Sequence, residues 1–371
     1  MKMAYKKLGD VCEILDSKRI PITASERKSG QYPYYGANGV QDYVSDFIFD
    51  DELVLLAEDG GNFGSKDRPI AYRVSGKCWV NNHAHVLKPL PDIDVDYLCY
   101  ALMFYDTTGL INGATRQKLT QSAMRQMQIP IRSLDEQKAI VQKISTATGL
   151  ITLRKTQLQK LDQLASSRFI EMFGSSLNDT IYPIIKLNQL SIKISDGVHA
   201  KPDYQPTGMP FLSVVNIVRG FVDFTNCKYV SKEAYEKMIR STNPQKGDVL
   251  YTKVGATYGI PAYVDTEQKF CLYVSVCLIK PNHAQINSKF LAFSMGMPYI
   301  KKQADARIKG IGVPDLHLNQ IREFDIITPP RALQNEFAAF VEQLDKSKVT
   351  IRKSIEKLET TYRALLQEYF G

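Results

Sequence analysis

The chain repeats itself at a distance of 197 residues, and this duplication constrains the fold more than any other feature of the sequence. From position 113 to position 174 the second copy follows the first without a gap. The matching residues are Gly113 and Gly310, Leu119 and Leu316, Arg125 and Arg322, Ile129 and Ile326, and Gln137 and Gln334. Nearer the start of each copy the distance shortens, to 195 for Gly60 and Gly255, 192 for Lys88 and Lys280, and 179 for Lys7 and Lys186. Self-similarity of this kind marks a repeated structural unit, so we expect two bodies of one architecture that differ in their middle part.

Each copy ends in a long segment with a heptad pattern. Residues 134–173 contain no proline and a single glycine, Gly149. Their apolar residues recur at alternating steps of four and three, which is the pattern of a coiled-coil seam. The predicted seam residues are Ile140, Ile144, Ile151, Leu158 and Leu161 in the first copy, and Phe337, Val341, Leu344, Ile351, Ile355 and Leu358 in the second.

Basic residues interrupt the two seams at different places. Arg154 and Arg168 break the first seam, whereas Lys348 breaks the second. The seams therefore suit packing against each other, and we expect an antiparallel two-helix coiled coil between two globular bodies. A helix of about 38 residues would span about 57 Å. The alternative is a long amphipathic helix that lies on its own body, but such packing usually requires a wider apolar stripe.

Each copy begins with a strand-rich body. In the first body we predict strands at 52–57 and 79–87 around a loop at 59–64, followed by a short helix near 95–105. In the second body the counterparts are strands at 247–254 and 270–279, a loop at 255–259 and a helix near 288–296. The expected fold class is α+β, with bodies at residues 1–133 and 175–331 and helices at 134–174 and 332–371.

The composition excludes several classes of protein. The six cysteines among 371 residues form no C-x-x-C pair, which favours reduced thiols in a cytoplasmic protein over a disulfide frame or a zinc site. No run reaches the roughly 18 apolar residues of a membrane helix, and residues 1–10 lack the apolar core of a signal peptide. We therefore expect no membrane association.

Basic residues and amides accompany glycine-rich loops in both bodies. The net charge of +8 is by itself a weak indication of nucleic-acid binding. Glycines permit close backbone approach, cations bind phosphates, and amides can read base edges. For any single residue, an ordinary solvated side chain is the better interpretation, so the argument depends on recurrence in both copies. The candidate DNA-binding residues are Asn62, Lys66, Arg68, Asn81, Asn82, His83, Arg116, Lys118, Lys201, Asn216, Lys253, Tyr258, Arg307 and Lys309.

Motifs of catalysis and metal binding are missing from the sequence. The loop at 59–64 lacks the G-x-G-x-x-G spacing of a dinucleotide site, and no P-loop is present. The segment 328–331 is not the motif of an amino-methyltransferase. His83 and His85 are predicted to share one face of a strand without a carboxylate or cysteine at ligand spacing, so we expect no metal site. These absences disfavour an enzyme that acts alone, and we predict no catalytic residues.

Several strings of the sequence resemble one known family. In the first body these are Tyr-Pro-Tyr-Tyr-Gly-Ala-Asn-Gly at 32–39, the stretches 55–60 and 79–87, and Pro…Leu-x-Glu-Gln within 128–137. The second body has its counterparts of these strings at 247–250 with Gly255 and at 329–334. There Gln334-Asn335 stands where the first copy has Glu136-Gln137. Over its full length the chain resembles the specificity subunit of type I restriction–modification enzymes, with each body in the place of a target-recognition domain.

The resemblance implies a function that composition and spacing do not show. In this family each recognition domain reads one half of a bipartite double-stranded DNA target, and the paired helices set the gap and dock two modification subunits. Those methyltransferase subunits carry S-adenosylmethionine and methylate adenine, whereas this chain binds no cofactor. Restriction (motor-nuclease) subunits join them to cleave unmodified DNA. Two alternatives stay open: a coiled-coil protein-assembly adaptor, and a specificity subunit for a fused nuclease–methylase.

Overall fold

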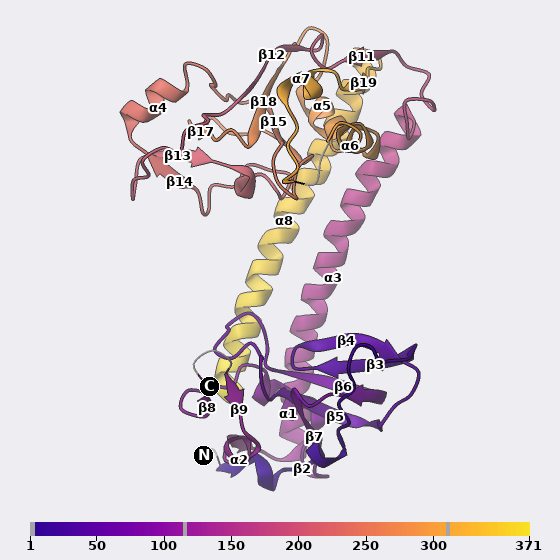
Figure 1. Ribbon diagram of the computed structural model, residues 1–371, viewed down its shortest axis with the longest axis vertical. Helices are drawn as coiled ribbons and strands as arrows, with labels where there is room; N and C mark the ends of the chain where they lie inside the picture. Colours follow the sequence, from indigo (N-terminus) through magenta and orange to yellow (C-terminus); the bar gives the residue numbers. More distant parts are fainter. Residues whose placement is uncertain (1–3, 114–116, 309–311) are drawn as a thin grey trace. The chain divides into compact units, whose positions relative to one another are not determined.

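The computed structural model describes residues 4–113, 117–308 and 312–371 and divides into two compact units (Figure 1). Unit 1 consists of Met1–Thr156 and Arg352–Gly371, and unit 2 of Gln157–Ile351. Two 40-residue helices, α3 (Leu134–Phe173) and α8 (Arg331–Phe370), contribute to both units. Their bounds differ by 197 residues at each end, as the repeat requires.

The other elements of unit 1 form a mixed body of strands and short helices. Its strands are β1 (Ala4–Lys7), β2 (Cys12–Ile14), β3 (Ser29–Gly36), β4 (Gly39–Val44), β5 (Phe49–Ala57), β6 (Ala71–Val80), β7 (Ala84–Pro89), β8 (Ile111–Asn112), β9 (Lys118–Leu119) and β10 (Gln128–Ile131). Its short helices are α1 (Val95–Met103) and α2 (Gln121–Arg125). Six strands pair in the order β2-β7-β5-β6-β3-β4, and β1 pairs antiparallel with β10.

Unit 2 repeats this plan with shorter strands. The strands are β11 (Ile184–Lys186), β12 (Ser191–Asp196), β13 (Met209–Leu212), β14 (Lys228–Val230), β15 (Val249–Thr252), β16 (Pro261–Tyr263), β17 (Cys271–Leu272), β18 (Val276–Pro281) and β19 (Asp325–Ile327). The short helices are α4 (Lys232–Met238), α5 (Ser288–Met295), α6 (Pro298–Asp305) and α7 (Leu318–Arg322). One sheet runs β12-β18-β15-β16, a second runs β14-β13-β17, and β11 pairs with β19 as β1 does with β10.

The central strand of each unit is buried on both faces. In β5, Val54 and Leu56 belong to the cluster that includes α1 and α2, whereas Leu53 and Leu55 belong to a cluster on the opposite face. In β15, Val249 and Tyr251 alternate with Leu250 in the same way. Side chains alternate between the faces of a strand, so a run of apolar residues at this position requires cover on both sides.

One buried glutamine fastens each long helix to its body. The Oε1 atom of Gln137 accepts a hydrogen bond from the Asp94 N–H (2.8 Å), and its Nε2 donates to the carbonyls of Asp92 (2.9 Å) and Arg132 (3.0 Å). Gln334 accepts from the Asn287 N–H (2.8 Å) and donates to the Pro329 carbonyl (2.8 Å). Gln334 is therefore the counterpart of Gln137, and the alignment of Gln334-Asn335 with Glu136-Gln137 was shifted by one residue.

Within unit 1 the first part of α3 packs antiparallel against the last part of α8. Lys155 forms an ion pair with Glu359 (3.0 Å), while the earlier residue Lys143 donates to the hydroxyl of the later residue Tyr369 (3.0 Å). Ile140 and Ile144 are buried in a cluster that also includes α8 side chains such as Tyr369. Apolar packing and polar contacts thus agree on the direction of the two segments.

Unit 2 contains the same arrangement with the helix ends exchanged. Asp162 on α3 pairs with Lys348 on α8 (2.7 Å), and Arg168 pairs with Glu336 (3.1 Å). Two of the cations that interrupt the heptads are therefore neutralised by the opposite helix. Phe337 shares a cluster with Phe169 and Phe173, two α3 residues that the heptad count left outside the seam.

Every predicted seam residue is at least half-buried. The buried ones are Ile140, Ile144, Ile151, Phe337, Val341, Leu344 and Ile355, and the half-buried ones are Leu158, Leu161, Ile351 and Leu358. Among the described residues, no helix has both the length and the apolarity needed to cross a membrane.

Two strand predictions were wrong in the same way. The segment 79–87 is the end of β6, a turn at Asn82 and His83, and the start of β7. The segment 270–279 likewise divides into β17 and β18 around a turn. His83 therefore lies in a turn and His85 in a strand, so the two rings do not share a face. Nearly continuous apolar residues hid the second turn, whereas Asn82 and His83 marked the first.

Candidate nucleic-acid interface

A cluster of loops at the end of β5 gathers several of the predicted DNA-binding residues of unit 1. A β-bridge joins Asp59 to Lys118, and the Gly60 N–H donates to the Gln117 carbonyl (3.4 Å). Gly60 has φ +63°, a left-handed conformation that favours glycine. The Glu58 N–H donates to the His83 carbonyl (2.9 Å), which brings the turn after β6 to the same place. We call this group, residues 58–64, 81–83 and 117–118, the unit 1 loop cluster.

The asparagines of the loop cluster have different roles. Asn81 is buried, accepts from the His83 N–H (2.8 Å) and donates to Gln41 Oε1 (3.1 Å), so it shapes the turn and is not placed to read bases. Asn62 donates to the Oδ1 atom of Asn38 (3.0 Å). Asn82 is exposed. Only Asn82 of the three therefore presents an exposed side chain.

The basic residues predicted in unit 1 are exposed where they are described. Lys66 and Arg68 lie in the loop that follows the glycines, where the Ser65 hydroxyl accepts from the Arg68 N–H (3.0 Å). Half of the Lys118 side chain is accessible (50%), and its ammonium pairs with Glu58 (3.0 Å). Arg116 lies outside the described residues.

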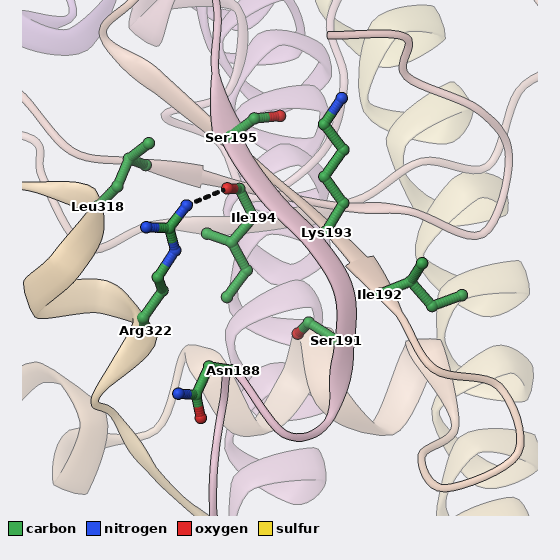
Figure 2. Close-up of a pocket in the computed structure, with 8 residues that line it drawn as sticks. All are labelled: Asn188, Ser191, Ile192, Lys193, Ile194, Ser195, Leu318 and Arg322. Atoms are coloured by element: carbon green, nitrogen blue, oxygen red, sulfur yellow. Dashed lines mark hydrogen bonds between the residues drawn. The ribbon is translucent and has the colours of Figure 1, made fainter. Parts of the chain in front are cut away.

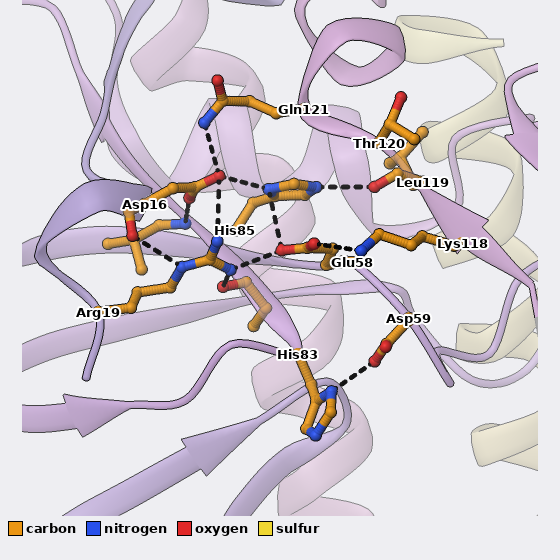
Figure 3. Close-up of polar contacts among 12 residues, drawn as sticks. Asp16, Arg19, Glu58, Asp59, His83, His85, Lys118, Leu119, Thr120 and Gln121 are labelled. Atoms are coloured by element: carbon orange, nitrogen blue, oxygen red, sulfur yellow. Dashed lines mark hydrogen bonds and ion pairs between the residues drawn. The ribbon is translucent and has the colours of Figure 1, made fainter. Parts of the chain in front are cut away.

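An ion-pair network lies beside the loop cluster (Figure 3). Arg19 contacts Glu58 (2.7 Å), Asp16 (3.6 Å) and the Ala84 carbonyl (2.7 Å). Asp16 also accepts from the Val86 N–H (2.9 Å) and lies 2.7 Å from Nδ1 of His85. The network thus ties the segment after β2 to β5, β7 and β9, and it fixes the backbone from which the loops project.

Hydrogen bonding determines the ionisation of this network. Burial raises the pKa of Asp16, but the His85 ring, Gln121 and the Val86 N–H outweigh it and lower the pKa to about 2. The Nε2 atom of His85 faces the Leu119 carbonyl (2.9 Å), which only accepts, and its Nδ1 faces the Asp16 carboxylate. Both ring nitrogens are therefore already in contact with oxygen atoms of the protein. Arg19 pairs with both carboxylates, and Lys118 gives Glu58 a second cation.

Asp16, Glu58 and His85 also have the composition of a metal site. Their ligand atoms all lie within 4.8 Å of one another. Arg19 and Lys118 already neutralise Glu58, however, and both nitrogens of the His85 ring already contact protein oxygens. A metal ligand needs a free lone pair on the imidazole, so this arrangement fits an ion-pair network better than a metal centre. The grouping was missed because Asp16 and Glu58 are remote from His85 in sequence.

Unit 2 has a counterpart of the unit 1 loop cluster at residues 253–259 and 312–315, which we call the unit 2 loop cluster. The equivalent backbone groups form the same hydrogen bonds in both clusters. The Gly255 N–H donates to the Pro314 carbonyl (2.9 Å), and a β-bridge joins Val254 to Asp315. Gly255 has φ +86°. The Leu316 N–H donates to the Lys253 carbonyl (2.9 Å), as that of Leu119 does to Glu58 (2.7 Å).

Three predicted contacts in unit 2 have structural roles instead. Lys253 is buried between Asp315 (3.4 Å) and Asp196 (3.6 Å), so its ammonium does not reach a phosphate. Asn216 is buried and caps a short turn, accepting from the Ser213 N–H (3.1 Å). Arg307 donates to the Gln303 (2.8 Å) and Glu323 (3.1 Å) carbonyls. The sequence around these three residues does not indicate the partners that hold them.

Of the remaining predicted residues of unit 2, the structure describes Tyr258 and Lys201. Tyr258 is half-buried, its hydroxyl bonds Asp305, and the Lys301 ammonium lies over its ring (3.6 Å from the centroid). Lys201 is exposed and lies 5.9 Å from the centroid of Tyr204. Lys309 lies outside the described residues.

A shallow pocket of about 470 Å³ lies beside β12 and α7 of unit 2 (Figure 2). Three of its polar side chains already have partners in the protein. Arg322 donates to the Ile194 carbonyl (3.0 Å), Lys193 to the Ser241 carbonyl (2.5 Å) and Ser191 to the Leu187 carbonyl (2.8 Å). The pocket offers no cluster of catalytic or cofactor-binding groups.

Comparison with known proteins gives a consistent result. The family model of the type I restriction modification DNA specificity domain matches residues 2–163 and 184–360, one segment for each copy. A Haemophilus influenzae protein assigned as a type I restriction enzyme specificity subunit is 24% identical, over 99% of this chain and 96% of its own length. The type I restriction enzyme MjaVIII specificity subunit of Methanocaldococcus jannaschii is 19% identical, over 97% of this chain and 90% of its own.

Solved structures share the fold. The crystal structure of a type I restriction-modification S subunit from M. genitalium aligns with a TM-score of 0.59 at 16% identity, over 100% of this chain and 97% of the other. A chain from a structure on complex assembly and conformational transition of the type I R-M system aligns with a TM-score of 0.54 at 15% identity, over 100% and 99%. With both copies matched by the family model, the chain belongs to the type I restriction modification DNA specificity family.

Proposed function

We propose that the chain is the DNA-reading subunit of a type I restriction–modification complex, in which each unit reads one half of a bipartite target. The observation that carries this proposal is the loop cluster at the end of the central strand, which recurs in both units with the same hydrogen-bond register. Glycines with positive φ form the turn of each cluster, and exposed Lys66 and Arg68, in the adjoining loop, supply phosphate contacts in unit 1. The differing side chains of the two clusters suit two different half-sites.

The long helices are proposed to act as a two-helix coiled coil that sets the gap between the half-sites. Antiparallel packing inside each unit and the buried heptad residues support this role. A 40-residue helix has a length of about 60 Å, enough to separate two readers on one duplex. The duplication also gives two equivalent faces, which suits docking of two modification subunits by pseudo-two-fold symmetry.

Catalysis is assigned to the partners in this proposal. The modification subunits would bind S-adenosylmethionine and methylate adenine, and the restriction subunits would cleave DNA. The buried thiols support a passive role for the cysteines of this chain, because burial raises the pKa values of Cys12, Cys78, Cys99, Cys271 and Cys277 to about 12.

The decisive experiment is a genome-wide map of methylated adenines in cells with and without this chain. We expect a bipartite sequence whose methylation disappears when the chain is deleted and returns when it is restored. An unchanged methylation map would contradict the proposal. A protein-assembly adaptor predicts no sequence-selective protection of DNA by the assembled complex, and neighbouring reading frames would distinguish separate from fused partners.

A second experiment tests the DNA-facing surface of unit 1. The double variant K66A/R68A should bind DNA more weakly in the assembled complex, and the slope of log affinity against log salt should fall by about 1.8 if both cations contact phosphates. The matched control is K6A/K7A, which removes the same charge from β1 outside the loop cluster. Equal effects of the two double variants would show that the loop of Lys66 and Arg68, which adjoins the loop cluster, is not part of the binding surface.

A further inference from the structure

The two loop clusters carry an ion pair at equivalent positions, with the charges exchanged. In unit 1 the residue after the central strand is Glu58, and it pairs with Lys118 (3.0 Å). In unit 2 the same two positions hold Lys253 and Asp315, which pair at 3.4 Å. The shared bridges and backbone hydrogen bonds, which connect 59 with 118 and 254 with 315, establish that the positions correspond.

One member of each pair is buried and the other is accessible. The side chains of Glu58 and Lys253 are 13% and 5% exposed, whereas those of Lys118 and Asp315 are 50% and 43% exposed. The accessible members extend from the short segment that borders each glycine turn. The surface that each loop cluster presents is therefore cationic at 118 and anionic at 315.

The accessible member is not needed to neutralise its buried partner. Arg19 lies 2.7 Å from Glu58, so that carboxylate keeps a cation without Lys118. Asp196 lies 3.6 Å from Lys253, so that ammonium keeps an anion without Asp315. The accessible charges are available for a further interaction while the buried charges stay balanced.

A carboxylate in a DNA-facing loop needs a specific reason, because phosphates repel it. In the major groove the amino group of cytosine is the donor that carboxylates accept from, while lysine donates to the acceptor edge of guanine. We propose that positions 118 and 315 read bases in their respective half-sites, with Lys118 selecting guanine and Asp315 selecting cytosine. This inference rests on the proposed function and adds to it the residue pair that makes the two half-sites differ.

The test measures the base preference of the reconstituted complex on a randomised DNA library. Wild-type complex should prefer cytosine at one position of the second half-site, and D315N and D315A should each reduce that preference about tenfold. D315A should also bind random DNA several-fold more tightly, because a charge that repels phosphates has been removed. The first half-site should be unchanged by both variants.

The control is D325N, because Asp325 is also a partly exposed, ion-paired aspartate of unit 2 (30% exposed, 2.8 Å from Lys186) but lies on β19. D325N should keep the wild-type preference at every position. In unit 1, K118M should lose a guanine preference in the first half-site only. A uniform loss of affinity with a smaller salt slope would assign Lys118 to a phosphate and overturn its part of the inference.

The outcomes separate this inference from the function on which it rests. A wild-type complex without any preferred sequence would overturn both. A wild-type preference that D315N and D315A leave intact at every position would overturn the inference alone. The thermal unfolding temperature of each variant is compared with that of wild type. An unchanged temperature shows that Lys253 and Glu58 keep a stable environment without their accessible partners.

Discussion

Replacement of the glutamine that fastens each long helix should destabilise one unit and spare the other. In Q137L the leucine fills a similar volume but leaves the Asp94 N–H and the carbonyls of Asp92 and Arg132 without their partner. Each unsatisfied buried group costs about 1–3 kcal/mol. Water can partly rehydrate these groups at the helix start, which lowers their summed cost. We therefore expect Q137L to lower the free energy of unfolding by about 3–5 kcal/mol, a large part of a typical 5–15 kcal/mol.

Amide hydrogen exchange resolves the effect by unit. A loss of 3 kcal/mol corresponds to an increase of about 150-fold in exchange for amides that open with the affected unit. In Q137L this increase should cover α1 and the start of α3, and in the counterpart Q334L it should cover α5 and the start of α8. The control Q142L replaces an exposed glutamine of α3 and should change stability by less than about 0.5 kcal/mol. A loss below about 1 kcal/mol in Q137L, or one spread equally over both units, would refute the reasoning.

Three further predictions concern single residues of the two units. Asp16 has a pKa of about 2 in the folded chain and 3.8 ordinarily, so its pairing adds about 2 kcal/mol of stability above pH 4 that is lost as the pH falls toward 2. Urea unfolding of wild type and D16N should therefore differ at pH 7 and converge in acid, and a constant difference would contradict this. I144A removes a fully buried side chain and should cost about 2–5 kcal/mol in unit 1 by denaturant unfolding; a cost below 1 kcal/mol would contradict the packing. K348M should change stability by less than about 1 kcal/mol, because the partner Asp162 is largely exposed, and a loss above 2 kcal/mol would show a stronger ion pair.

The repeat and the heptads predicted the scaffold well because both patterns are local and periodic. The absence of proline over 134–173 and the four-three spacing indicated a helix whose observed bounds are Leu134–Phe173. The pairing of Gln137 with Gln334 across 197 residues marked a shared role, although only the structure shows that both side chains bond backbone groups. Phe169 and Phe173 were missed because they pack on the body of unit 2 as well as on α8.

The candidate interface was harder to predict because its side chains are fixed by partners remote in sequence. Lys253 was predicted to bind phosphate beside a glycine turn and Asn216 to read a base edge, yet Asp196 and Ser213 hold them inside unit 2. Asp315 was not predicted because phosphates attract cations and repel carboxylates. Its position, 197 residues after Lys118, was the available signal, since the repeat aligns the two directly.

The length of the gap between half-sites tests the central claim most directly. Insertion of three heptads after Thr156 and after Ile351 lengthens both helices by about 32 Å, which equals about nine base pairs of DNA at 3.4 Å per pair. The complex reconstituted with this variant should select the same two half-sites with a gap longer by about nine base pairs. An unchanged gap, in a variant that assembles and shows the added helix by circular dichroism, would contradict the account.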